Sequence, residues 1–163
     1  VECIQKGLEG FKGVKRRLEI VGQQNGVTVI SDYGHHPTEL RATIDAIKVG
    51  WGSALNRLHV VFEPHRYSRT RACFAEFLHA FSGADNLVLT EIYAASERPI
   101  DGISGSSLCS AIEHPCKQFV SEIDAIPAGL VRTLEPGDIV LCSGAGSIGH
   151  LPQQIVAALS ELR

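Results

Sequence analysis

The chain has 163 residues, 44% of them hydrophobic, which suits one domain that buries its own core. Its formal net charge of −3 argues against a nucleic-acid-binding protein, because phosphate binding normally needs an excess of Lys and Arg. It has no apolar run of about 18 residues and no charged-then-apolar N-terminus. We therefore expect a cytoplasmic protein that contacts neither a membrane nor a nucleic acid.

The cysteines give no sign of a metal site or a disulfide framework. They are odd in number, widely spaced and contain no CxxC pair. Free thiols packed as small hydrophobic residues are the expected state in a reducing compartment. The five are Cys3, Cys73, Cys109, Cys116 and Cys142.

Residues 1 to 13 show little periodicity, so we expect a lead-in segment or the cut end of something longer, followed by a single domain over residues 14 to 163. The domain begins with two short apolar stretches, Arg17 to Gln23 and Val27 to Asp32. Asn25-Gly26 between such stretches is a strong β-hairpin signal. One antiparallel strand is therefore expected before the parallel ones.

Helical and strand patterns alternate along the rest of the chain. Apolar residues recur at helical spacing after Pro37, and compact apolar runs that suit buried strands follow each helical stretch. The expected helices are Pro37 to Gly50, one through Phe74 to Phe81, Leu108 to Ile112, Ile123 to Leu134 and Leu151 to Leu162; the expected strands are Leu58 to Phe62, Asn86 to Ile92, Gln118 to Val120 and Asp138 to Ser143. This order predicts a Rossmann-like α/β domain, with an open, mostly parallel sheet and helices on both faces.

The first strand-to-helix turn carries reactive side chains between Asp32 and Pro37. Such turns gather at the carboxyl ends of parallel strands, where open α/β sheets bind ligands. Asp32 could accept hydrogen bonds from a sugar hydroxyl, hold a cation or cap the helix. His35 and His36 are adjacent and so point in different directions, and no HxH or HxxxH spacing includes His65. We expect no metal site, and imidazoles that hydrogen-bond a substrate or cap a helix.

A second turn places Arg66, Arg69 and Arg71 at the start of a helix. Cations there oppose the helix dipole, and each costs about 0.3 to 1 kcal/mol of stability when no anion pairs with it. Two guanidinium groups three residues apart can grip one carboxylate or phosphate from one side. The alternative is a solvated helix start whose arginines pair with Glu63 or Glu76.

The glycine turn Gly144 to Gly149 fits GxGxxG after a strand and before a helix. A dinucleotide site wants that motif after the first strand, with an acid about 20 residues further on, whereas this chain ends at Arg163. The glycines could let backbone N–H groups approach a ligand, or serve only close packing. The sequence has no GxxxxGK[ST], so another domain would have to supply most of the grip on a nucleotide.

Five motifs together resemble the C-terminal domain of the Mur ligase family. They cover nearly the whole chain in the family's order, and HHPTE followed by PHRYSRT is specific. The motifs are GVKRRLE from Gly13, SDYGHHPTEL from Ser31, VFEPHRYSRT from Val61, EIYAASERPIDGISG from Glu91 and LCSGAGSIG from Leu141. The nearest branch is the one that adds L-alanine to UDP-N-acetylmuramate, and the branch that recycles murein tripeptide resembles the arginine turn less well.

The resemblance implies an ATP-dependent acid–amino acid ligase of bacterial peptidoglycan synthesis. ATP would convert the muramate carboxyl to an acyl phosphate, and the amine of L-alanine would attack it, releasing ADP and phosphate. N-terminal and central domains in the same protein would hold UDP-N-acetylmuramate, the P-loop and most Mg²⁺ ligands, so this chain alone is expected to be inactive. A non-catalytic nucleotide-binding module and an L-alanine sensor remain alternatives.

The resemblance also assigns roles to individual residues. Those that match residues facing the L-alanine carboxylate are Arg66, Arg69, Tyr33, His35 and His65. Asp32 matches an acid on the ATP ribose, and Arg17 matches an arginine near the phosphates. No residue is assigned as a certain base, although His35 or His65 could take the proton of the amine.

Overall fold

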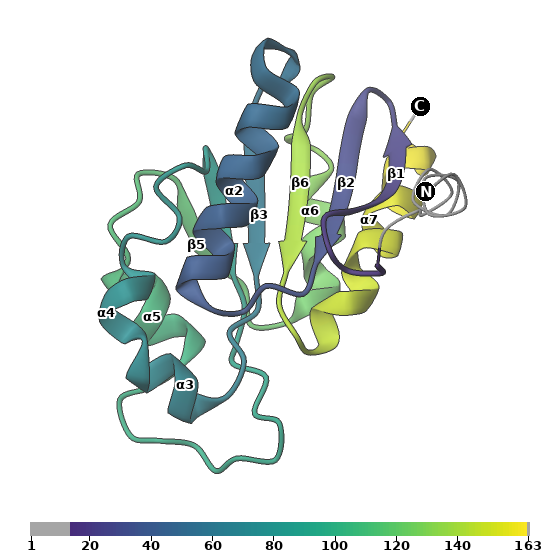
Figure 1. Ribbon diagram of the computed structural model, residues 1–163. Coiled ribbons are helices and arrows are strands. Elements are labelled where there is room, and N and C mark those ends of the chain that lie inside the picture. Colours follow the sequence, from purple (N-terminus) through teal and green to yellow (C-terminus); the bar gives the residue numbers. More distant parts are fainter. Residues whose placement is uncertain (1–13, 163) are drawn as a thin grey trace, which may run out of the picture.

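The computed structural model describes residues 14–162, and the expected lead-in segment, residues 1–13, lies outside them. One six-stranded sheet in the order β1-β2-β6-β3-β4-β5 forms the centre of the molecule, with helices on both faces (Figure 1). The strands are β1 Glu19–Gln24, β2 Val27–Asp32, β3 Leu58–Phe62, β4 Asn86–Leu89, β5 Lys117–Phe119 and β6 Ile139–Ser143. The helices are α2 Pro37–Trp51, α3 Tyr67–Ala72, α4 Phe74–Phe77, α5 Gly105–Ala111, α6 Ile126–Leu130 and α7 Leu151–Glu161, with short 3₁₀ turns η1 Gly52–Ala54, η2 Ile123–Ala125 and η3 Ser147–His150.

The predicted hairpin is confirmed. β1 and β2 pair antiparallel, and both turn residues are left-handed, with φ of 53° at Asn25 and 78° at Gly26. Two left-handed residues are the signature of a type I′ turn, which matches the twist of the flanking strands. β1 begins only at Glu19, because positive φ at Arg16 and Leu18 interrupts an extended strand before it.

The other strand pairs are parallel, so the carboxyl ends of β2, β6, β3, β4 and β5 lie at one edge of the sheet. β6, the last strand in the sequence, lies between β2 and β3. Its final residue Ser143 is opposite Asp32 on one side and Phe62 on the other. The glycine turn therefore lies between the first turn and the arginine turn, which brings together three segments that are distant in the sequence.

Each face of the sheet has its own apolar core, as expected for helices on both faces. On one face α2, α4 and α5 pack against β3 and β4 through fully buried side chains such as Leu40, Phe77 and Leu108. On the other face α6 and α7 pack against β2, β3 and β6, with Ile126 and Ile155 buried. No helix within residues 14–162 is long and apolar enough to cross a membrane.

Two expected helices are shorter than predicted. The helix expected through Phe74 to Phe81 is only the four residues of α4, Phe74–Phe77, yet the rings of Phe77 and Phe81 still lie 5.5 and 5.3 Å from the ring of Phe62. Packing on the sheet therefore positions this segment more than helix propensity does. The helix expected over Ile123 to Leu134 reduces to η2 and α6, because Thr133 donates its N–H and hydroxyl to the carbonyl of Leu130 and closes the helix end.

Candidate functional site

Three turns at the carboxyl edge are tied together by hydrogen bonds. The Ser143 hydroxyl donates to the Gly34 carbonyl at 2.8 Å, and the Gly144 N–H donates to the Asp32 carbonyl at 3.2 Å. The Glu63 N–H donates to the Ser143 carbonyl at 3.1 Å. The first turn, the glycine turn and the arginine turn thus form one connected platform for the side chains above them.

An aromatic row crosses this platform. Ring centroids lie 5.5 Å apart for Tyr33 and His35, 5.6 Å for His35 and His65, and 5.6 Å for His65 and Tyr93, with the last pair stacked at 13°. The structure brings together three predicted residues and adds Tyr93, which sequence reasoning missed. Its position directly after the expected strand Asn86 to Ile92 was the available signal, and in the structure a parallel bridge joins Tyr93 to His65.

His65 is held in one neutral tautomer. Burial lowers its pKa, and the nearby positive charges of Arg69 and Arg66 lower it further. Arg69 Nη1 lies 3.2 Å from His65 Nδ1, and a guanidinium can only donate. Nδ1 of His65 is therefore an acceptor, and Nε2 carries the proton.

His35 has the opposite tautomer. Its Nδ1 lies 3.0 Å from the Tyr33 carbonyl oxygen, which can only accept, so Nδ1 carries a proton. The Glu39 carboxylate accepts from the N–H groups of His35 and His36 at 3.0 and 3.1 Å. Burial alone would raise the pKa of Glu39, but these two bonds and the charge of Arg17 lower it overall. In neutral His35, the lone pair at Nε2 remains available to a ligand.

His36 caps a helix, which is one of the roles expected for it. Its Nδ1 accepts the Thr38 N–H at 3.2 Å, and this bond forms half of a capping box with Glu39 at the start of α2. Its Nε2 lies 3.6 Å from the Cys73 sulfur, away from the aromatic row. Within residues 14–162, no three His, Cys, Asp or Glu side chains are placed to hold a metal ion.

The arginine turn carries charges that this part of the chain leaves unpaired. Among the described residues, no carboxylate lies within 4 Å of the guanidinium of Arg66, Arg69 or Arg71, so the alternative pairing with Glu63 or Glu76 is wrong. Arg66 has φ 70° and ψ 135°, an unfavourable conformation for a residue with a side chain. Its N–H donates to the Tyr93 carbonyl at 2.9 Å, which helps to hold that geometry.

Glu97, distant in the sequence, caps the start of α3, and sequence reasoning missed this contact as well. Glu97 accepts from the backbone N–H and the hydroxyl of Ser68 at 2.9 and 2.6 Å. These hydrogen bonds lower the pKa of Glu97, and the charge of Arg66 acts in the same direction. The carboxylate therefore caps the helix in place of its own N-cap residue, Arg66, which makes no side-chain cap bond.

Two further arginines reach the site from the segment before β1. The guanidinium carbons of Arg16 and Arg17 lie 5.0 and 5.7 Å from the centre of the Tyr33 ring, within cation–π range. Arg16 Nη2 donates to the Gly144 carbonyl, and its buried Nε has no hydrogen-bond partner among residues 14–162. Arg16, which sequence reasoning passed over, is the residue of the two that contacts the glycine turn.

Asp32 is buried beneath the first turn with only 5% of its surface exposed. Its Oδ1 accepts the Gly34 N–H at 2.7 Å and the Thr43 hydroxyl at 3.4 Å, while Oδ2 accepts the Leu18 N–H at 2.9 Å. The carboxylate therefore fixes the turn after β2 and the backbone before β1. Oδ2 has one further acceptor position.

The glycine turn is closed by the protein's own side chains. The Glu63 carboxylate accepts the Ile148 N–H at 3.0 Å and the Ser147 hydroxyl. A Cβ on Gly146 would lie 2.4 Å from Tyr93 Cγ and 2.5 Å from Glu63 Oε2. Glycine is needed here for close packing, and a carboxylate already lies at the backbone N–H where a dinucleotide phosphate would bind.

Comparison with known proteins was consistent with this arrangement. The family model described as "Mur ligase, glutamate ligase domain" matches residues 16–146. UDP-N-acetylmuramate–L-alanine ligases from Desulforapulum autotrophicum and Geobacter sulfurreducens are 49% and 47% identical over 160 and 163 residues, which cover 96% and 98% of this chain. The solved UDP-N-acetylmuramate-alanine ligase of Thermotoga maritima aligns with a TM-score of 0.77 and 25% identity over 97% of this chain and 33% of its own.

The fold also matches the murein peptide ligase of Psychrobacter arcticus, with a TM-score of 0.76 and 24% identity over 97% of this chain and 32% of that one. The chain spans 35% of the length of the two curated ligases. The family match covers the hairpin, the first two turns and the start of the glycine turn. The chain thus belongs to the Mur ligase family, as its glutamate ligase domain.

Proposed function

We propose that this domain positions L-alanine in an ATP-dependent ligase that joins it to UDP-N-acetylmuramate during bacterial peptidoglycan synthesis. The unpaired guanidinium groups of Arg66 and Arg69, beside the aromatic row at the carboxyl edge, are the observation that supports it. The relatives that match nearly all of this chain carry that ligase name. The other domains of the ligase would supply the nucleotide sugar, the P-loop and most Mg²⁺ ligands.

The two arginines suit a small carboxylate. A guanidinium presents a planar fork of N–H donors, and charge-assisted bonds to a carboxylate are about twice as strong as neutral ones. The hydrogen bond to His65 already orients Arg69, so the Arg69 side chain loses little rotational freedom when a ligand binds. Tyr33 and His35 would then border the amino acid on the side of the first turn. Positioning of the amine is the catalytic contribution expected of such a site.

Two residues of this domain, Arg17 and Asp32, could contribute to an ATP site. Arg17 is exposed beside Tyr33, where a phosphate could reach it, and Oδ2 of Asp32 could accept a ribose hydroxyl at its remaining position. When bound, ATP supplies the phosphoryl group that activates the muramate carboxyl. The role of these two residues would be to bind and orient the nucleotide.

Of the two candidate bases, the tautomers favour His35. Nε2 of neutral His65 already carries a proton and Nδ1 accepts from Arg69, so neither nitrogen is free to take one. Nε2 of His35 has a free lone pair when the ring is neutral. His35 would therefore accept the proton of the alanine amine if a side chain does so.

The rival function, a dinucleotide-binding module, finds less support in the geometry. The glycine turn would have to release the Glu63 carboxylate and move Tyr93 before a pyrophosphate could approach. A titration of the isolated chain separates the functions. Tight NAD binding would favour the module, measurable alanine affinity without ATP would favour a sensor, and weak binding of every ligand suits a domain whose site other domains complete.

The test of the carboxylate role uses the full-length enzyme that carries this domain. We expect Arg66→Ala to raise the KM for L-alanine about tenfold or more, with a much smaller change for ATP, because it removes a charged hydrogen bond worth about 1.5 to 3 kcal/mol. Steady-state kinetics with each substrate varied gives both constants. Arg132→Ala, an exposed arginine away from the site, is the control, and equal effects on both substrates would contradict the assignment.

A second experiment tests His35. The pH profile of kcat/KM in full-length His35→Asn should lose its acid limb, whereas His65→Asn should keep it while raising the KM for L-alanine. Asn retains hydrogen-bonding ability but does not titrate in this range. An acid limb that persists in both variants would remove both histidines as bases.

A further inference from the structure

A cavity of about 450 Å³ opens at the amino-terminal edge of the sheet, opposite the candidate site. It lies where α6 ends early, so that the starts of β3, β4 and β5 form its floor and Ile126, Gly129 and Leu130 form one wall. A volume of this size lies in the range of small-molecule sites. Nothing in the proposed ligase function uses this part of the molecule.

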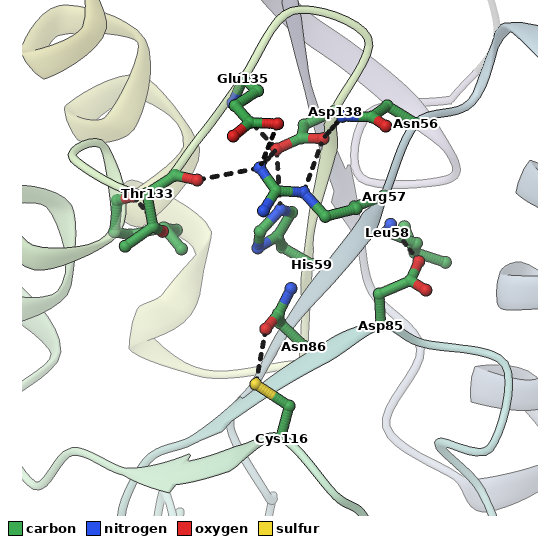
Figure 2. Close-up of polar contacts among 11 residues, drawn as sticks. Asn56, Arg57, Leu58, His59, Asp85, Asn86, Cys116, Thr133, Glu135 and Asp138 are labelled. Atoms are coloured by element: carbon green, nitrogen blue, oxygen red, sulfur yellow. Dashed lines mark hydrogen bonds and ion pairs between the residues drawn. The ribbon is translucent and has the colours of Figure 1, made fainter.

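The floor contains a buried histidine with one free nitrogen. His59 is 3% exposed, and its Nε2 lies 3.0 Å from Asp138 Oδ2 (Figure 2). Asp138 also accepts from Asn56, from the N–H of Glu135 and twice from Arg57, so its oxygens are fully used. The carboxylate fixes the proton on Nε2, and Nδ1 is left as an acceptor with no partner among residues 14–162.

A donor faces the same space from the next strand. Asn86 Oδ1 accepts the Cys116 thiol at 2.7 Å, which leaves the amide nitrogen Nδ2 without a partner in the described part of the chain. Figure 2 shows this amide nitrogen pointing toward His59. An acceptor and a donor on neighbouring strands therefore line one cavity and remain unsatisfied by the protein.

The charged side chains around the cavity already have partners in the protein. Arg57 donates to Asp138 through Nε and Nη2 at 3.2 and 2.7 Å, and Lys117 directs its ammonium to two carbonyls at the end of α5. Burial lowers the pKa of His59, against the opposing effect of Asp138, so the imidazole is neutral at pH 7. Among the described residues that line the cavity, both cations have partners and none is Asp or Glu, so the site favours an uncharged ligand.

We propose that this cavity binds a flat, uncharged heterocyclic lactam about the size of a purine base. Its ring N–H would donate to His59 Nδ1, and its adjacent carbonyl would accept from Asn86 Nδ2. The aliphatic side chains of Val88, Ile126 and Leu130 would contact the ring. A lactam edge carries this donor and acceptor side by side, which a simple alcohol or carboxylate does not.

The test is a titration of the chain with 4-quinazolinone, followed by NMR. We expect a Kd of about 1 mM or lower for a fragment of this size. The 3-methyl derivative lacks the N–H and should bind about tenfold more weakly. No shift of cavity resonances at about 5 mM, or equal binding of the methylated compound, would overturn the proposal.

Two polar variants test the contacts. His59→Phe and Asn86→Asp should each weaken binding about tenfold, because each removes one polar partner from the cavity. His79→Phe repeats the first change and Gln153→Glu makes the corresponding amide-to-carboxylate change, both at exposed positions elsewhere, and both variants should bind as the parent chain does. Binding that survives both cavity variants would contradict the assignment.

A third variant fills the cavity without touching a polar group. A Cβ on Gly129 would meet no atom within 4 Å, so Gly129→Leu can extend a side chain over the opening without strain. We expect it to abolish binding, whereas Gly50→Leu, equally open but on α2 on the other face, should not. This pair keeps the proposal testable even if His59→Phe fails to fold, and unchanged binding in Gly129→Leu would overturn it.

Discussion

The two edges of the sheet treat positive charge in opposite ways. At the amino edge, Arg57 meets Asp138 at 2.7 Å, and Asp138 is fully buried with five hydrogen bonds (Figure 2). At the carboxyl edge, Arg66 and Arg69 have no carboxylate within 4 Å among the described residues. The paired charges at the amino edge stabilise the fold, whereas the unpaired charges at the carboxyl edge are available to bind an anionic ligand.

The effect of each arrangement on stability depends on whether its charges have partners. Burial alone would raise the pKa of Asp138, but hydrogen bonds from Arg57, the Glu135 N–H and His59 lower it overall, so the carboxylate is ionised and satisfied. At the carboxyl edge Arg66 precedes α3 and Arg69 lies in its last turn, so only Arg66 opposes the dipole of this helix, and neither guanidinium has a carboxylate within 4 Å among the described residues. The difference implies that loss of the Asp138 carboxylate at the amino edge costs stability, whereas loss of the Arg66 or Arg69 guanidinium at the carboxyl edge costs binding.

The largest effect should come from Asp138→Ala. Removing a buried carboxylate that pairs Arg57 and orients His59 should lower the free energy of unfolding by about 3 to 5 kcal/mol. Urea denaturation followed by circular dichroism measures the change. Asp45→Ala on the exposed face of α2 is the matched control and should stay within about 0.5 kcal/mol. A loss below about 1 kcal/mol in Asp138→Ala would remove the contrast between the edges.

Much of this architecture was visible in the sequence. Asn25-Gly26 located the hairpin, and the apolar runs at β2 and β3 matched the observed strands residue for residue. The gathering of the first turn and the arginine turn at one edge followed from parallel strands alone. Local patterns of this kind are read well because strand burial and turn chemistry act over a few residues.

Other parts depended on long-range packing. That β6 lies between β2 and β3 decides which turns meet, and no local pattern encodes it. Arg16 rather than Arg17 contacts the glycine turn, from a segment in which Arg16 and Leu18 have positive φ, a conformation that is uncommon for residues with side chains. His59 within an apolar strand was the available signal for the amino-edge cluster, and sequence reasoning did not use it.

An intermediate effect should appear on acidification, and it compares one histidine from each edge. The folded-state pKa values of His59 and His65 are both lowered, chiefly by burial. The unfolded chain therefore binds more protons than the folded one as the pH falls below about 6.5, and stability decreases by at most about 1.4 kcal/mol per pH unit for each group.

The comparison is made by urea denaturation at about pH 7 and pH 5.5, which brackets the ordinary pKa of histidine. His59→Gln should reduce the loss of stability on acidification more than His65→Gln does, because His59 is the more buried of the two. Exposed His79→Gln is the control. If His59→Gln loses as much stability as the parent chain between about pH 7 and pH 5.5, the fold does not hold the His59 imidazole neutral.

The smallest effect is also the sharpest test of the contrast. Arg66 has φ 70° and ψ 135°, and a conformation of this kind costs about 1 to 3 kcal/mol for a residue with a side chain but little for glycine. Arg66→Gly should therefore raise the free energy of unfolding by about 1 kcal/mol while removing the proposed contact to L-alanine. The same change at Arg71, within α3 and exposed, should instead lower stability by about 1 kcal/mol, since glycine disfavours a helix interior. Urea denaturation of both variants measures these changes. A higher free energy of unfolding in Arg66→Gly together with a lower one in Arg71→Gly means that the fold tolerates backbone strain at the carboxyl edge to hold a guanidinium there. A lower free energy of unfolding in both variants would mean that the Arg66 side chain stabilises the domain.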